Sequence, residues 1–203
     1  KSFERIREFK QQGTSLLIVS HDKTAIQGIC DGVILLNSGM LEAYGSPEAM
    51  MDLYNAKLSG VGASISQVLS SDGKVVTISG TGDAQVVEIK MLDNGLKEIK
   101  TVKVGASLNL KVLVKINKLI DRLVFGFGIK DRYGQIVFGT NTHFYEKAID
   151  DLRVNQIIEF NVEFEANIGE GTYSIQTALV SSDTHLEKNY EWKDMAYIFE
   201  VVN

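Results

Sequence analysis

The sequence contains very little cysteine and histidine, and each shortage excludes a class of structure or site. Cys30 is the one cysteine, so no disulfide can form within the chain. Only three histidines are present in 203 residues, and no Cys/His cluster has the spacing of a zinc site. We therefore expect no metal site, and the scarcity of cysteine is consistent with a reducing cytoplasm.

Long apolar runs and an excess of basic residues are missing too. No apolar run approaches the roughly 20 residues of a membrane-spanning helix, so any membrane association is expected to be indirect. The chain holds 21 Lys and Arg against 26 Asp and Glu, a formal net charge of −5, with no stripe of positive charge. We expect no nucleic-acid partner, because nucleic-acid binding depends on clustered Lys and Arg. Hydrophobic residues make up 44% of the chain, an ordinary fraction for a globular protein.

Residues 1–57 alternate helix and strand signals. The run SLLIVS at 15–20 is continuously apolar, as in a strand covered on both faces of a parallel sheet. Ser46-Pro47-Glu48 is a strong helix start, with Ser as N-cap and Pro at the first helical position. The expected elements are helix 1–12, strand 15–20, helix 23–30 capped by Asp22, a hairpin of 32–37 and 40–44, and a helix from Ser46 to about Lys57.

The remainder of the chain follows a different pattern. Residues 58–73 are rich in Ser and Gly and are interpreted as a linker. From residue 74 to 203, apolar and polar residues alternate in short segments without intervening helices, which predicts a mainly β, antiparallel sandwich. The expected strands are 85–92, 107–117, 123–129, 136–140, 157–165, 172–180 and 196–202.

Three motifs in the first part carry a family resemblance. They are LLIVSHD at 16–22, CDGVILL at 30–36 and GSPE at 45–48. Their order resembles the C-terminal end of an ABC-type nucleotide-binding domain. By this resemblance His21 is the switch histidine, which contacts the ATP γ-phosphate and helps to orient the attacking water. ATP and magnesium would be cofactors of the full-length parent.

Other motifs of an ABC ATPase are missing. No G-x-x-x-x-G-K-[ST] phosphate loop (Walker A) occurs, and no strand ending in Asp-Glu (Walker B) precedes His21. LSGVG at 58–62 looks like the family's signature motif, but it follows the histidine instead of preceding it. We therefore expect this chain to have no catalytic residues and no cofactor of its own. Because it opens on Lys1 within a helical pattern, we expect it to be part of a longer protein.

The segment 124–142, VFGFGIKDRYGQIVFGTNT, carries a second resemblance. It looks like a hairpin in the C-terminal domain of O-antigen exporter ATPases of the Wzt type. This resemblance implies an immunoglobulin-like sandwich that dimerises and binds completed, lipid-linked O-polysaccharide. It also implies an integral membrane permease as partner, at the cytoplasmic face of the bacterial inner membrane.

Two aromatic clusters, at 143–146 and 190–193, hold most of the candidate sugar-binding residues. Protein sites bind sugars through aromatic faces and planar polar groups, so exposed aromatics are needed. Trp192 has a core position as its alternative, and Gly126 and Gly128 leave one strand face bare either for a ligand or for close packing. The polar pair at 141–142 fits a turn cap equally well. The expected carbohydrate-binding residues are Asn141, Thr142, His143, Phe144, Tyr145, Tyr190 and Trp192.

Two other functions are compatible with parts of the sequence. A glycosidase needs two carboxylates at a defined separation, and the acidic pairs Asp150-Asp151 and Glu187/Glu191 are more simply a solvated surface. Alternatively, the sandwich is a dimerisation or regulatory module without a glycan site. Exposed strand edges favour pairing between protomers, and the last strand, 196–202, is the one expected to exchange.

Overall fold

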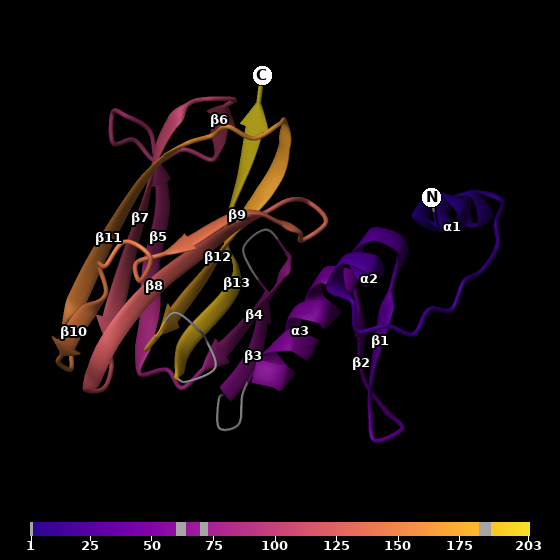
Figure 1. Ribbon diagram of the computed structural model, residues 1–203, viewed down its shortest axis with the longest axis horizontal. Helices are drawn as coiled ribbons and strands as arrows, with labels where there is room; N and C mark the ends of the chain where they lie inside the picture. The colour runs from indigo at the N-terminus through magenta and orange to yellow at the C-terminus, as the bar shows by residue number, and fades with distance from the viewer. Residues whose placement is uncertain (1, 60–63, 70–72, 183–187) are drawn as a thin grey trace. The chain divides into compact units, whose positions relative to one another are not determined.

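The structure, a computed structural model, describes residues 2–59, 64–69, 73–182 and 188–203 (Figure 1). The chain divides into two compact units, Lys1–Asn55 and Ala56–Asn203, which are described separately. Within the described ranges, no helix combines the length and apolar character needed to cross a membrane.

The first unit contains the helix starts and the hairpin that were expected from the sequence. The Asp22 carboxylate accepts a hydrogen bond from the Ala25 N–H at 3.1 Å, as an N-cap should. The Ser46 hydroxyl oxygen lies 3.4 Å from the Ala49 nitrogen, in the same capping position. The elements are α1 (Ser2–Gln11), α2 (Lys23–Ile29), the antiparallel hairpin β1 (Val33–Asn37) and β2 (Met40–Gly45), and α3 (Pro47–Ser59), whose last residues belong to the second unit.

The prediction of a strand at 15–20 is wrong in this structure. The segment has no strand conformation, and Leu17 and Val19 are 94% and 95% exposed. A strand needs a paired neighbour, and no described residue pairs with this segment. Its apolar side chains instead border an open hollow of about 930 Å³ in the first unit.

The second unit consists of two β-sheets. The larger, with eight strands among the described residues, has the order β10-β8-β12-β13-β4-β3, with β9 also paired to β8 and β6 parallel to β13. The smaller has the order β11-β7-β5. The strands are β3 (Ser64–Leu69), β4 (Val75–Gly80), β5 (Ala84–Leu92), β6 (Thr101–Lys103), β7 (Ser107–Ile116), β8 (Ile120–Lys130), β9 (Ile136–Asn141), β10 (Ile149–Leu152), β11 (Ile157–Glu165), β12 (Gly171–Val180) and β13 (Asn189–Val202).

The core lies between these two sheets. Alternate residues of β7 point into it, as the sequence pattern predicts, and all five are at most 1% exposed. Phe125 on β8 stacks on Phe160 on β11, with ring centroids 4.7 Å apart, and so joins the larger sheet to the smaller one. The mainly β, antiparallel sandwich expected from the sequence is confirmed. The buried residues of β7 are Leu108, Leu110, Val112, Val114 and Ile116.

Two expectations about the ends of the sandwich need correction. The stretch 58–73 is not a linker throughout, because residues 64–69 form β3 and pair with β4; residues 60–63 and 70–72 lie outside the described residues. Nor is the last strand an exposed edge. Residues 197–201 pair with β12 and residues 200–202 pair with β6, so exchange of 196–202 would break pairing with both strands.

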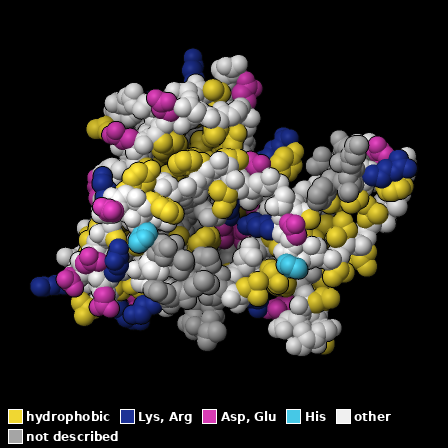
Figure 2. All heavy atoms as spheres, viewed as in Figure 1, with side chains coloured by type: hydrophobic (Ala, Val, Ile, Leu, Met, Phe, Trp, Pro, Cys, Tyr) yellow, Lys and Arg dark blue, Asp and Glu magenta, His cyan; other side chains and the backbone are white. Residues whose placement is uncertain are grey.

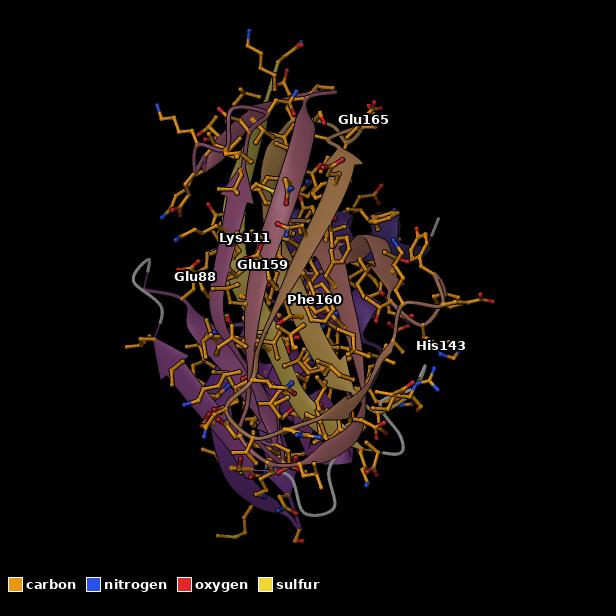
Figure 3. All side chains as sticks on the ribbon, turned by 90° about the vertical axis from the view of Figure 1, so that its left-hand side faces the viewer. Glu88, Lys111, His143, Glu159, Phe160 and Glu165 are labelled. Atoms are coloured by element: carbon orange, nitrogen blue, oxygen red, sulfur yellow. The ribbon has the colours of Figure 1, made fainter. Side chains whose placement is uncertain are left out.

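The outer face of the smaller sheet is charged. Glu88, Lys111 and Glu159 lie on this face, whereas His143 lies apart from it (Figure 3). Lys111 pairs with Glu159 at 2.9 Å across β7 and β11, and both side chains keep contact with solvent, at 30% and 45% exposure. Paired charges on an exposed strand face are typical of a solvated surface.

A buried carboxylate links the two sheets. Glu191 on β13 is 5% exposed, and its Oε1 accepts a hydrogen bond from the Val86 N–H at 2.9 Å, at the point where the β5 register shifts. Burial raises the pKa of this carboxyl, although the Val86 N–H acts in the opposite direction.

Glu191→Gln should therefore raise the free energy of unfolding at neutral pH above that of the parent chain. The amide oxygen keeps the acceptor for Val86, and no charge is buried. A raised native pKa contributes stability that is present below the unfolded-state pKa and lost as pH rises through the folded-state pKa. Urea unfolding between pH 4 and 8 should show this loss in the parent chain and not in the variant. Equal pH profiles for the two proteins would contradict it.

Candidate functional site

A hollow of about 250 Å³ opens on the outward face of the larger sheet. Its floor is one row of paired residues across four strands. Gly126 on β8 pairs with Asn141 on β9 and with Ala178 on β12, and Ala178 pairs with Trp192 on β13. Paired residues project to the same face, so this row brings residues from positions 126 to 192 of the sequence to one place.

Two glycines of β8, Gly126 and Gly128, lie in the floor of the hollow. A Cβ on Gly126 would lie 3.3 Å from the Cβ of Asn141, and one on Gly128 would lie 3.2 Å from the Cγ of Gln176. The alternate residues of β8, including Phe125 and Ile129, point into the core. The side chains of Asn141 and Gln176 therefore pack closely beside the two glycines, as in the close-packing alternative, and the glycines themselves present bare backbone to the hollow.

Two aromatic residues form walls. Phe144 is 75% exposed, and Trp192 is half-buried, and both line the hollow. The Asn141 Oδ1 accepts a hydrogen bond from the Phe144 N–H at 3.1 Å, which fixes the turn that carries Phe144. On this side of the second unit, hydrophobic side chains gather over the region of β8 and β9, while charged ones lie mostly toward its edges (Figure 2).

Neutral polar groups complete the lining. They come from Thr140, Asn141 and Gln176. Gln176 was not among the expected site residues. It is 7% exposed and stands on β12 between Ile175 and Thr177, which are also buried. The sequence gives little local signal for it, because β12 also carries Thr172, Ser174 and Thr177. A buried amide needs a polar partner or a ligand, but only the fold shows that this amide is buried.

Three other expected residues, Thr142, His143 and Tyr145, do not line the hollow. Thr142 extends the β8–β9 pairing: its hydroxyl oxygen accepts from the Phe125 N–H at 3.0 Å, and its N–H donates to the Phe125 carbonyl at 2.8 Å. His143 packs edge-on against Phe144, with centroids 6.4 Å apart. Tyr145 is 63% exposed. The structure thus places Thr142 in a structural role and the other two beside the site.

Tyr190 is not available to a ligand, which corrects its expected role. It is 2% exposed within the core, and its hydroxyl donates to the Arg122 carbonyl at 3.0 Å. Burial raises the pKa of this phenol, with Asp121 and Asp83 adding to the effect. Adjacent strand residues alternate between faces, so Trp192 and Tyr190 would share a face in a regular strand. The sequence alone did not show which of them enters the core.

The remaining candidates lie elsewhere. His21 is exposed and borders the hollow of the first unit. Asp150 and Asp151 are exposed on β10, where Asp150 lies 3.9 Å from Arg122. Among the described residues, no three His, Cys, Asp or Glu side chains are grouped so as to hold a metal ion. The glycine-floored hollow is thus the candidate binding site of the second unit.

Comparison with known families supports the resemblance seen in the hairpin. The model of the Wzt C-terminal domain matches residues 75–203, more than half of the chain. The chain belongs to this family. The Wzt C-terminal domain is the part of exporter ATP-binding proteins that is not the ATPase. A crystal structure of the C-terminal domain of Wzt has the same fold, with a TM-score of 0.57, 14% identity, and coverage of 75% of this chain and 86% of that one.

Two of the curated relatives are named as export proteins. The teichoic acids export ATP-binding protein TagH of Lactococcus lactis is 44% identical over 54 residues, 27% of this chain and 12% of that protein. The O-antigen export system ATP-binding protein RfbB of Klebsiella pneumoniae is 36% identical over 59 residues, 29% of this chain and 24% of that protein. The matched part of this Wzt-family chain therefore spans a quarter or less of the length of either relative.

Proposed function

We propose that the Wzt-type sandwich recognises completed O-antigen polysaccharide without catalysis, so that an ABC transporter exports it. The observation that carries this proposal is the hollow whose bare glycine floor lies between Trp192 and Phe144. Sugar rings present flat C–H surfaces and ring hydroxyls, and they bind where aromatic faces stand beside planar amides. Asn141 and Gln176 supply those amides.

The wider setting follows from the relatives. RfbB and TagH are named as export ATP-binding proteins, so we propose a membrane permease as partner and the cytoplasmic face of the inner membrane as location. ATP and magnesium would bind the parent protein, with His21 as its switch histidine. The polysaccharide would be lipid-linked, and two copies of the chain would act together in the transporter.

Trp192→Ala should weaken the binding of O-polysaccharide about tenfold, because one wall of the hollow is lost. The protein tested is the 203-residue chain, and the polysaccharide is that of the producing strain. Phe144→Ala should act in the same direction, and its 75% exposure means that the fold does not depend on it. Isothermal titration calorimetry with purified polysaccharide measures both effects, and circular dichroism checks the fold.

Tyr190→Phe is the matched control. It removes a hydroxyl from an aromatic residue of the same strand, and the lost hydrogen bond to Arg122 should cost about 1 kcal/mol of stability. Binding should stay unchanged, because the ring lies in the core. If Trp192→Ala bound the polysaccharide as tightly as this control, the hollow would not be the glycan site.

A dimerisation module without a glycan site is the second candidate. One observation favours it: β9 presents Ile136, Val137 and Phe138 at 59%, 46% and 44% exposure. Exposed apolar side chains on β9 can pack against a second copy of the chain. Sedimentation that depends on concentration, together with no polysaccharide binding at all, would favour this reading.

A further inference from the structure

The row of paired residues that contains Trp192 continues beyond β13. Trp192 pairs with Ser79 on β4, and Ser79 pairs with Ile65 on β3. Paired residues project to the same face, so Ile65 and Ser79 lie on the outward face together with Trp192. In the order of the larger sheet, β3 is the last strand and lies beside β4 (Figure 1). The row therefore reaches from the hollow to the edge of the sheet.

Trp192 stands between two small residues in this row. Ala178 lies on one side of it and Ser79 on the other. Small neighbours do not fix the direction in which an indole leans, so the next residue along the row matters. On the β4 side that residue is Ile65, two strand spacings or roughly 10 Å away, a distance that an indole and an aliphatic side chain can close between them. Ile65 is half-buried, whereas the other residues of β3 are exposed.

β3 is fixed to β4 on both sides of Ile65. The Ser64 hydroxyl donates to the Gly80 carbonyl at 3.1 Å, and the Gln67 amide nitrogen donates to the Thr77 hydroxyl oxygen at 3.2 Å. These bonds set the register in which Ile65 faces Ser79. Burial contributes little more, since no residue of β3 belongs to the described core. The pairing of β3 with β4 is therefore the part of the larger sheet that opens at low cost.

β4 is in turn fixed to β13 next to Trp192. The pairs that join these two strands are Ser79 with Trp192 and Ile78 with Lys193. Gly80 has a φ of +142°, and a Cβ on it would overlap the Tyr190 carbonyl, so the two backbones approach as closely as glycine permits. A displacement of β4 is therefore passed to β13 at Trp192 and its neighbours.

β3 also has a distinct place in the chain. It follows α3 and precedes residues 75–203, the part that the Wzt C-terminal domain model matches. We infer that β3 positions Trp192: paired with β4, it places Ile65 beside the indole and keeps the indole at the wall of the hollow. The segment that leads from α3 into the sandwich is thereby coupled to the binding site. The inference rests on the proposed function.

Ile65→Ala tests the inference, with Leu69→Ala as the matched control. Both substitutions remove the same amount of hydrocarbon from the same face of β3, but Leu69 is 74% exposed and pairs with Val75, outside the row. Trp192 is the one tryptophan, so the fluorescence of the 203-residue chain reports its surroundings. Ile65→Ala should shift the emission to longer wavelength and increase quenching by acrylamide, and Leu69→Ala should leave both unchanged.

Binding should follow the fluorescence. Ile65→Ala should weaken the binding of O-polysaccharide about fourfold, the effect of losing contact with about one methylene group, and Leu69→Ala should bind as the parent does. Ile65→Val keeps a branched side chain at this position and should restore most of the affinity and of the emission spectrum. Calorimetry measures the affinities, and thermal melts show that the three variants are folded.

Hydrogen exchange gives the converse measurement. Coupling between two sites is reciprocal, so polysaccharide bound to the parent chain should slow the exchange of the amides at 64–69 about fourfold. In Trp192→Ala, saturation with the same polysaccharide should leave these amides unchanged, because the link in the row is missing. Unaltered exchange at 64–69 in the saturated parent chain would contradict the coupling.

The outcomes separate this inference from the proposed function. Equal Trp192 fluorescence in Ile65→Ala and Leu69→Ala, or equal affinity of these two variants for the polysaccharide, would overturn the inference. If the proposed function fails, the parent chain does not bind the polysaccharide at all. A difference in fluorescence between the two variants would then still support the positioning of Trp192 by β3, and its role in glycan binding would be refuted.

Discussion

Leucine in place of Ala178 should reduce polysaccharide binding about a hundredfold while the sandwich stays folded. Ala178 lies at the centre of the hollow's floor, paired on one side with Gly126 and on the other with Trp192. Its Cβ already points into the hollow, so the added carbons extend into ligand space and not into the core. Exclusion of the ligand from the floor should cost about 2.7 kcal/mol of binding free energy, which corresponds to about a hundredfold in affinity.

Two variants at glycine positions provide comparisons for Ala178→Leu. Gly126→Ala adds one methyl group to the same floor, at 3.3 Å from the Asn141 Cβ, and should give an intermediate loss. Gly169→Leu adds a side chain where nothing lies within 4 Å of a Cβ, before β12 begins, and should leave binding unchanged. Calorimetry orders the affinities, and thermal melts confirm folding. Parent-like affinity in Ala178→Leu would place the ligand elsewhere.

The sandwich could be predicted because its strands carry their own signal. On β7 every second residue is aliphatic, and a half-buried strand needs no further information to be recognised. The apolar run at 15–20 carries an equally clear local signal but is not a strand here. Its hydrophobicity indicates burial by partner strands, and pairing is a property of the fold and not of the segment.

The start of β13 shows the opposite failure. Residues 189–194 are mostly polar and were expected to precede the last strand, yet they belong to it. Glu191 and Asp194 are buried there because each meets a distant partner, the Val86 N–H and the Lys130 ammonium. Such partners are separated by tens of residues in sequence, so no local pattern predicts them.

The site was predicted in part for the same reason. Both walls of the hollow, Phe144 and Trp192, are among the carbohydrate-binding residues expected from the sequence. Their meeting depends on the pairing of β9, β8, β12 and β13 in one register, which a single sequence does not specify. Gln176 was missed because β12 mixes polar and apolar residues, so no local pattern distinguishes this amide. Tyr190 was misplaced because its hydroxyl finds a carbonyl inside the core.

Asp194→Ala should destabilise the second unit by about 3–5 kcal/mol. Its carboxylate and the Lys130 ammonium form an ion pair in which the side chains are 6% and 1% exposed. Removing the carboxylate leaves a buried cation without this partner, and that cost is a large share of the about 5–15 kcal/mol that holds a typical domain together. Urea unfolding followed by the fluorescence of Trp192, the one tryptophan, reports this unit.

The pair also holds an irregular part of β13. Between the pairs Ile175–Tyr197 and Thr177–Lys193, β13 has more residues than β12, and Met195 has a φ of +50°. A bulge of this kind re-aims neighbouring side chains, and Trp192 lies just before it. Asp194→Ala should therefore weaken polysaccharide binding even under conditions in which the variant is folded.

Two comparisons separate the buried charge from its side effects. Lys130→Met with Asp194→Leu removes both charges together and should recover most of the stability, because hydrocarbon replaces the pair. Lys111→Met breaks the pair with Glu159, which is partly exposed, and should cost no more than about 1 kcal/mol. If Asp194→Ala were no more destabilising than Lys111→Met, the ion pair would not hold the bulge. The orientation of Trp192 would then depend on packing alone.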